Sequence, residues 1–137
     1  MKIGYTQGTF DTLHYGHIRL LKNAKQLCDY LIVGVNSDKL VKEYKNTDTI
    51  IKEKERVEIV SSIKYVDEVH IVESLDKKTK KDVFHFDIVF IGDDWKGNPR
   101  YIKTEEELKQ IGVELVFLPY TKTISTTMIK KIKGEKK

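Results

Sequence analysis

Five short segments of the 137-residue chain are rich in β-branched and aromatic residues, and longer polar stretches separate them. The sequence predicts strands at 2–6, 30–35, 66–72, 87–92 and 113–118. The segments YLIVGV, DIVFIG and VELVFL are apolar at nearly every position, which is typical of strands that are covered on both faces. The pattern therefore predicts a buried, mostly parallel sheet of five strands.

Apolar residues between these strands recur at helical spacing. The clearest stripe consists of Ile18, Leu21, Ala24 and Cys28. Further helices are predicted at 54–63, 104–111 and 125–133. Because strands alternate with helices, we expect a Rossmann-like, doubly wound α/β fold with helices on both faces of the sheet. Such a fold binds ligands beyond the carboxyl ends of its strands.

Composition agrees with one globular domain over residues 1–137. Hydrophobic residues make up 39% and charged residues 34%, which favours a folded core over disorder. The polar stretches 36–54 and 73–86 are expected to be mobile. The 25 Lys and Arg are interleaved with 21 Asp and Glu, and no aromatic stacking platform accompanies them, so nucleic acid is not an expected partner.

Targeting signals and cysteine usage point to one compartment. The first residues lack the apolar core of a signal peptide, and no apolar run is long enough to span a membrane. Cys28 is the only cysteine, so an internal disulfide is excluded. We therefore expect a cytoplasmic protein without a membrane partner.

The segment GTFDTLHYGH at 8–17 follows the first predicted strand and leads directly into the first predicted helix. It contains neither the GxGxxG nor the GxxxxGK[ST] pattern, but phosphates are often held at such a strand-to-helix turn. His14 and His17 stand three residues apart, so both imidazoles can reach one α-phosphate as pyrophosphate leaves. Main-chain N–H groups or close backbone approach are expected at Gly8, Thr9 and Gly16.

Two other interpretations of the histidine pair stay open. Together with Asp11 the pair offers zinc-ligand chemistry, although the HExxH spacing and a further nearby ligand are missing. The rings can also simply cap the helix or lie on the surface. We expect no protein-held metal, and we expect Mg²⁺ to accompany a nucleoside triphosphate.

GTFDTLHYGH resembles the GTFDxxHxGH element of the cytidylyltransferases, which belong to the HxGH nucleotidyltransferase superfamily. KYVDEV at 64–69, GDDWKG at 92–97 and ISTTMI at 124–129 are similar to later elements of that family, in the same order. The resemblance covers most of the chain and is strongest to the small bacterial glycerol-3-phosphate cytidylyltransferases. It implies a homodimeric enzyme that transfers CMP from CTP to a small phosphorylated acceptor and releases pyrophosphate.

The resemblance also implies roles for single residues. His14 and His17 would contact the triphosphate and stabilise the transition state, while Thr9, Phe10 and Asp11 would line the same site. Phe10 is equally compatible with core packing. Phosphate charge would be neutralised by Lys42 or Lys45 in the loop after the second strand, and by Arg56.

Later elements are implied to bind the nucleotide. Positions beside the base and ribose are implied for Asp93, Asp94 and Trp95, and Gly92 in the same nucleotide-binding element permits the sharp turn. Packing on the sheet edge is the alternative for Trp95, and the two aspartates are alternatively Mg²⁺ ligands or solvated side chains. Phosphate contacts at the start of the last helix are implied for Ser125, Thr126 and Thr127, although Ser125 alone is also an ordinary N-cap.

Three positions depart from the family's pattern. Tyr120 and Lys64 stand where the family has arginines, and Thr123 replaces a glycine. Either Lys64 or Lys122 substitutes for the lost guanidinium, or the acceptor differs, so polyol, sugar, amino alcohol and amino acid phosphates all stay open. The alternative functions are an adenylyltransferase of the same superfamily and a non-catalytic nucleotide sensor.

Overall fold

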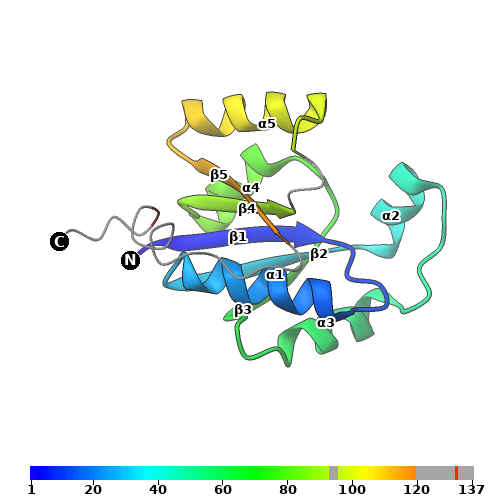
Figure 1. Cartoon of the computed structure of the whole chain (residues 1–137). Coiled ribbons are helices and arrows are strands. Elements are labelled where there is room, and N and C mark those ends of the chain that lie inside the picture. Colours follow the sequence, from blue (N-terminus) through cyan, green and yellow to red (C-terminus); the bar gives the residue numbers. More distant parts are fainter. Residues whose placement is uncertain (93–95, 120–131, 133–137) are drawn as a thin grey trace.

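The structure, a computed structural model, describes residues 1–92, 96–119 and 132, and it is built around a five-stranded sheet (Figure 1). The strands are β1 (Ile3–Gly8), β2 (Tyr30–Asn36), β3 (Glu68–Val72), β4 (Ile88–Gly92) and β5 (Glu114–Leu118). Each neighbouring pair is parallel, in the order β3-β2-β1-β4-β5. The five predicted strands and the Rossmann-like α/β fold are confirmed.

Five helices lie among the described residues. They are α1 (Tyr15–Gln26), α2 (Asp38–Lys45), α3 (Glu53–Ser61), α4 (Lys77–Phe84) and α5 (Pro99–Gln110). Helix α5 begins earlier than its apolar pattern suggests, because Asn98 caps it and Pro99 suits the first helical turn. The helix predicted at 125–133 falls almost entirely outside the described residues. None of the described helices has the length and apolar character needed to cross a membrane.

Two helices occur in the polar stretches that the sequence predicts to be mobile. Helix α2 lies within 36–54 and α4 within 73–86, where the apolar pattern does not define a helix. Helix α2 buries only Leu40 and Val41, which is too few apolar positions to produce a clear helical period. Its start is instead fixed locally, since the Ser37 side chain accepts a hydrogen bond from the Leu40 N–H at 3.0 Å.

The sheet is covered on both faces, which divides the hydrophobic core into two clusters. Leu20 and Leu21 of α1 and Val60 of α3 belong to the first cluster. Leu108 of α5 belongs to the second, and Phe84 of α4 packs against it. Figure 1 shows the same arrangement, with α1 and α3 on one side of the sheet and α4 and α5 on the other.

Neighbouring residues of one strand belong to opposite clusters. Val33 of β2 and Phe90 of β4 face the first cluster, whereas Ile32 and Val89, their neighbours in sequence, face the second. Burial on both faces explains why β2 and β4 are continuously apolar instead of alternating.

The strand order places a switch point beside the central strand. From β1 the chain adds β2 and β3 on one side and then returns to add β4 and β5 on the other. Adjacent crossovers therefore diverge at the carboxyl ends of β1 and β4, where doubly wound sheets open a crevice. Helix α2 lies beyond this end of the sheet (Figure 1).

Candidate active site

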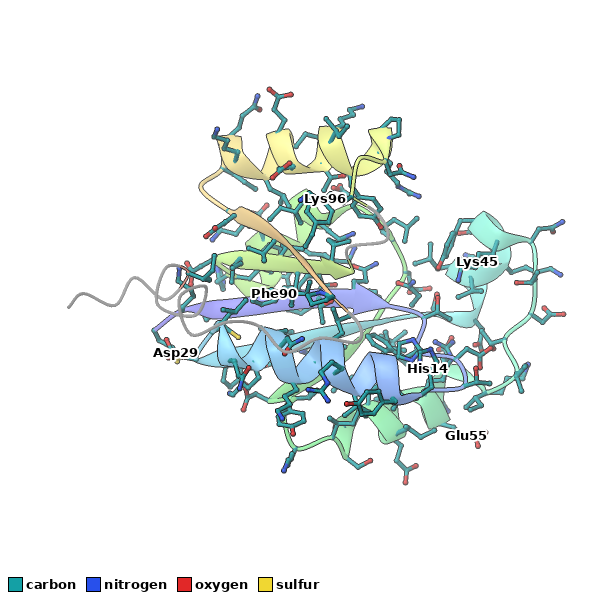
Figure 2. All side chains as sticks on the ribbon, in the orientation of Figure 1. His14, Asp29, Lys45, Glu55, Phe90 and Lys96 are labelled. Carbon is teal, nitrogen blue, oxygen red and sulfur yellow. The ribbon has the colours of Figure 1, made fainter. Side chains whose placement is uncertain are left out.

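A cavity of about 540 Å³ opens at the carboxyl ends of β1, β2 and β4. The predicted site residues that line it are Gly8, Thr9, Phe10, Asp11, His17, Lys45 and Gly92. Figure 2 shows His14 at the start of α1 and Lys45 at the end of α2, both at this end of the sheet. The fold thus gathers segments far apart in sequence around one concave surface.

The two histidines begin α1 and lie against each other. His14 is the N-cap, and its Nδ1 accepts a hydrogen bond from the Gly16 N–H at 3.0 Å. The Nδ1 of His17 accepts from the His14 N–H at 3.1 Å, which completes a reciprocal capping box. The ring centroids are 4.2 Å apart. The capping interpretation is therefore correct for one nitrogen of each ring.

This use of Nδ1 fixes what the other nitrogen can do. A nitrogen that accepts a hydrogen bond carries no proton, so a neutral ring must then bear its hydrogen on Nε2. Both imidazoles consequently present an Nε2–H donor, and His17 lies on the cavity wall. Capping and phosphate binding do not compete, because they use different atoms of the same side chains.

His17 should make the protein less stable in mild acid. Burial and the neighbouring His14 hold the pKa of His17 below its usual value of 6.5. The unfolded chain therefore binds more protons just below that pH, and the free energy of unfolding falls as the pH falls toward the folded-state pKa. Urea unfolding of the wild type and His17→Asn at about pH 7.5 and about pH 5.5 measures the difference. Asparagine keeps an acceptor near the Nδ1 position but does not titrate, so equal pH dependence in both proteins would contradict this assignment.

The loop between β1 and α1 adopts an unusual backbone. Phe10 and Thr12 have φ angles of 55° and 49°, in the left-handed region that side chains with a Cβ seldom occupy. The Asp11 carboxylate between them accepts hydrogen bonds from the Ile50 and Ile51 N–H groups at 2.8 and 2.9 Å. Such a backbone persists only where its surroundings hold it, and Asp11 supplies one restraint.

Asp11 and Phe10 thus serve the shape of the loop. Burial alone would raise the pKa of Asp11, but the two backbone hydrogen bonds and the charge of Arg56 outweigh it and hold that pKa below its usual range. Phe10 is 5% exposed and belongs to the first core cluster, so the core-packing interpretation is correct for it. A Cβ at Gly8 would lie 3.1 Å from the Phe10 ring, which explains the glycine.

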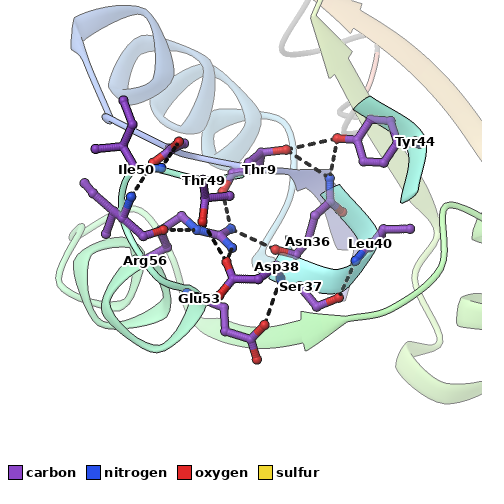
Figure 3. A network of polar contacts seen from close by, with 12 residues as sticks. Thr9, Asn36, Ser37, Asp38, Leu40, Tyr44, Thr49, Ile50, Glu53 and Arg56 are labelled. Atoms are coloured by element: carbon purple, nitrogen blue, oxygen red, sulfur yellow. Dashed lines mark hydrogen bonds and ion pairs between the residues drawn. The ribbon is translucent and has the colours of Figure 1, made fainter. Parts of the chain in front are cut away.

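Arg56 does not line the cavity, contrary to its predicted contact with phosphate. Its side chain is fully buried, and Nη2 binds the Asp38 carboxylate at 2.6 Å. The other guanidinium nitrogens donate to backbone carbonyls, those of Ile51 at 2.8 Å, Thr9 at 2.7 Å and Asn36 at 2.8 Å (Figure 3). Arg56 therefore connects the loop between β1 and α1 to the end of β2 and to α2.

The structure separates Lys42 from Lys45, the two lysines predicted to neutralise phosphate charge. Lys42 and Lys45 both lie in α2 and not in a loop. Lys45 lines the cavity, whereas Lys42 is exposed and pairs with Asp48 at 3.6 Å. Of the two lysines, the structure places Lys45 at the site.

Gly16, another predicted site residue, does not line the cavity, and others lie outside the part of the chain that the structure describes. The N–H of the buried Gly16 is already used by His14. The residues outside the described ranges are Asp93, Asp94, Trp95, Tyr120, Lys122, Thr123, Ser125, Thr126 and Thr127.

The cavity also contains residues that sequence reasoning missed. Lys77 and Arg100 form part of its wall. Burial, together with the nearby charges of Lys80 and Arg100, lowers the pKa of Lys77 to about 8. A signal was present, since LDKKTKKD follows the end of β3 at the ligand-binding edge. The run of lysines resembles an ordinary solvated helix face, so the sequence does not reveal that Lys77 and Lys80 are buried.

Known proteins are similar to this chain in sequence and in fold. The chain is 39% identical over 132 residues to glycerol-3-phosphate cytidylyltransferase of Bacillus subtilis, covering 96% of each chain. It is 42% identical over 121 residues to FAD synthase of Pyrococcus abyssi, covering 82% of this chain and 77% of that protein. The crystal structure of the lipopolysaccharide core biosynthesis protein from Thermoplasma volcanium is 27% identical, with a TM-score of 0.76, and the match covers 91% of this chain and 99% of that one. Residues 5–132 match the family described as cytidylyltransferase-like, and the chain belongs to this family of nucleotidyltransferases.

Proposed function

We propose that the enzyme transfers CMP from CTP to a small phosphorylated acceptor and forms a CDP-linked product. An oxygen of the acceptor phosphate attacks the α-phosphorus of CTP, and the bond from that phosphorus to the β-phosphate oxygen breaks. Pyrophosphate leaves with the electron pair of that bond. The observation that supports this proposal is the pair of Nε2–H donors whose rings the capping box fixes, that of His17 on the cavity wall and that of the exposed His14 beside it.

The two imidazoles suit the charge that develops in such a step. Their Nε2–H groups donate to oxygens of the α-phosphate, which gain negative charge in the transition state. Their tautomers are set by the backbone before any substrate binds, so no reorganisation of these donors is needed. His14 and His17 are therefore proposed as transition-state stabilisers and not as nucleophiles.

Cations on the cavity wall would hold the phosphates. Lys45 lies on α2, and Lys77 and Arg100 lie at the starts of α4 and α5. An incoming phosphate would favour the charged form of Lys77, whose pKa is lowered to about 8. We assign Lys77 and Lys45 to the acceptor phosphate, because they belong to helices that follow β3 and β2.

Mg²⁺ would enter with the nucleotide. Among residues 1–92, 96–119 and 132, no group of three or more His, Cys, Asp and Glu side chains is arranged to hold a metal. Both oxygens of Asp11 accept backbone N–H groups. In this proposal phosphate oxygens and water bind the ion, which would neutralise phosphate charge. A homodimer, implied by the family resemblance, stays a prediction.

An adenylyltransferase is the second candidate, and the 42% identity to an FAD synthase favours it. Pyrophosphate release distinguishes the two. The enzyme should be tested with CTP and with ATP against polyol, sugar, amino alcohol and amino acid phosphates. We expect release with CTP only when a phosphorylated acceptor is present. Release with ATP and an acceptor, but not with CTP, would establish the alternative. Nucleotide binding without turnover would indicate a sensor.

A further inference from the structure

A chain of polar side chains leads from the interior of the sheet to the cavity wall. The Nε2 of Gln7 donates to the Asn36 Oδ1 at 2.9 Å and to the Ser74 carbonyl at 2.9 Å. The Nδ2 of Asn36 donates to the Thr9 Oγ1 at 3.3 Å and to the Tyr44 hydroxyl at 3.2 Å. The two hydroxyls are 3.0 Å apart (Figure 3). Gln7, Asn36, Thr9 and Tyr44 all line the cavity.

The direction of this chain is dictated at its inner end. The Ser74 carbonyl can only accept, so the amide nitrogen of Gln7 must face it. The buried Tyr5 hydroxyl donates to the Gln7 Oε1 at 2.6 Å, and burial raises the pKa of Tyr5, so it stays a donor. Gln7 must then donate to the oxygen of Asn36, which turns the amide nitrogen of Asn36 toward the two hydroxyls.

Counting donors and lone pairs shows what the hydroxyl pair can still bind. Two hydroxyls carry two hydrogens and four acceptor lone pairs. Asn36 occupies one lone pair on each, and the bond between Thr9 and Tyr44 uses one hydrogen and one lone pair. Within the described part of the chain, these bonds leave one hydrogen and one lone pair for a ligand. An alcohol group matches both, whereas a phosphate only accepts and an ammonium only donates.

The position of the pair favours the acceptor over the nucleoside. Asn36 ends β2 and Tyr44 lies in α2, on the side of β1 away from Gly92 and β4. The Lys45 ammonium lies 5.5 Å from the centre of the Tyr44 ring, so a cation for a phosphate accompanies the hydroxyl pair. We propose that Thr9 and Tyr44, oriented by Gln7 and Asn36, bind an alcohol group of the phosphorylated acceptor and select for it. This inference rests on the proposed function.

Tyr44→Phe tests the proposal, because it removes one hydroxyl and keeps the ring. The probes are sn-glycerol 3-phosphate and its two monodeoxy analogues, each with CTP. The wild type should prefer the parent compound over one analogue by about 10-fold or more in kcat/KM. Tyr44→Phe should abolish that preference by slowing turnover of the parent compound, with the KM for CTP unchanged. Tyr30→Phe is the matched control, because Tyr30 begins β2, donates its hydroxyl to Glu68 and does not line the cavity.

Three results would overturn the inference in distinguishable ways. If Tyr44→Phe keeps the acceptor preference and instead loses discrimination between CTP and 2′-deoxy-CTP, the pair binds the ribose. If the wild type uses only amino alcohol phosphates and Tyr44→Phe does not change their kcat/KM, the proposed function stands and the inference fails. If no acceptor supports pyrophosphate release by the wild type, the proposed function itself fails.

Discussion

His14→Asn should leave the protein folded and lower its turnover by about 100-fold or more. Asparagine places an oxygen near the position of the His14 Nδ1, and it is among the preferred N-cap residues, so the bond from the Gly16 N–H is kept. It has no atom at the position of Nε2 and therefore loses the donor proposed for the α-phosphate. Pyrophosphate release measures turnover, and urea unfolding checks that the free energy of unfolding is nearly unchanged.

His14→Gln provides the opposite control. Its longer amide can place an N–H near the position of Nε2, but it offers no acceptor at Nδ1. This variant should lose about 1 kcal/mol of unfolding free energy and retain more turnover than His14→Asn. Near-normal turnover of His14→Asn would contradict the proposed role of His14, whatever the stability of the variant.

Arg56→Met should lower the free energy of unfolding by about 3 kcal/mol. The substitution leaves the carbonyls of Ile51, Thr9 and Asn36 without their donor and removes the cation from the Asp38 carboxylate. We expect the lower end of the usual range, because the Asp38 side chain is 34% exposed and water can replace part of the interaction. Urea or thermal unfolding measures the change.

Arg56→Lys separates charge from geometry. A lysine keeps the positive charge but cannot donate to three carbonyls and a carboxylate with one planar group. Its loss of stability should therefore fall between zero and that of Arg56→Met. A loss below about 1 kcal/mol for Arg56→Met would show that the guanidinium does not hold the loop as its contacts indicate.

The sheet was predictable from sequence, whereas helices α2 and α4 and the start of α5 were not. YLIVGV identifies β2 because burial on both faces requires apolar residues at every position, and that requirement is local. Helix α2 escapes detection because its start depends on the Ser37 cap and only two of its apolar side chains are buried. Helix α5 begins at a signal that apolar spacing ignores, the Asn98 cap followed by Pro99.

The site shows a similar division. The spacing of His14 and His17 predicts their proximity, but only the backbone geometry reveals which nitrogen each ring uses. The position of Arg56 could not be inferred, because its partner Thr9 is 47 residues away along the chain. The sequence shows that residue 56 is charged, but it does not show whether this charge is buried or at the surface.

The restraints on residues 8–14 have one further consequence. This loop leaves the central strand, is held midway through Asp11 and the Thr9 carbonyl, and ends in the cap made by His14. Its backbone has little freedom left to lose when a triphosphate arrives, so less of the binding energy offsets ordering. Substrates of other shapes must therefore be accommodated by side chains from neighbouring elements. Evolution can then alter what the enzyme modifies while the geometry around the phosphorus stays constant.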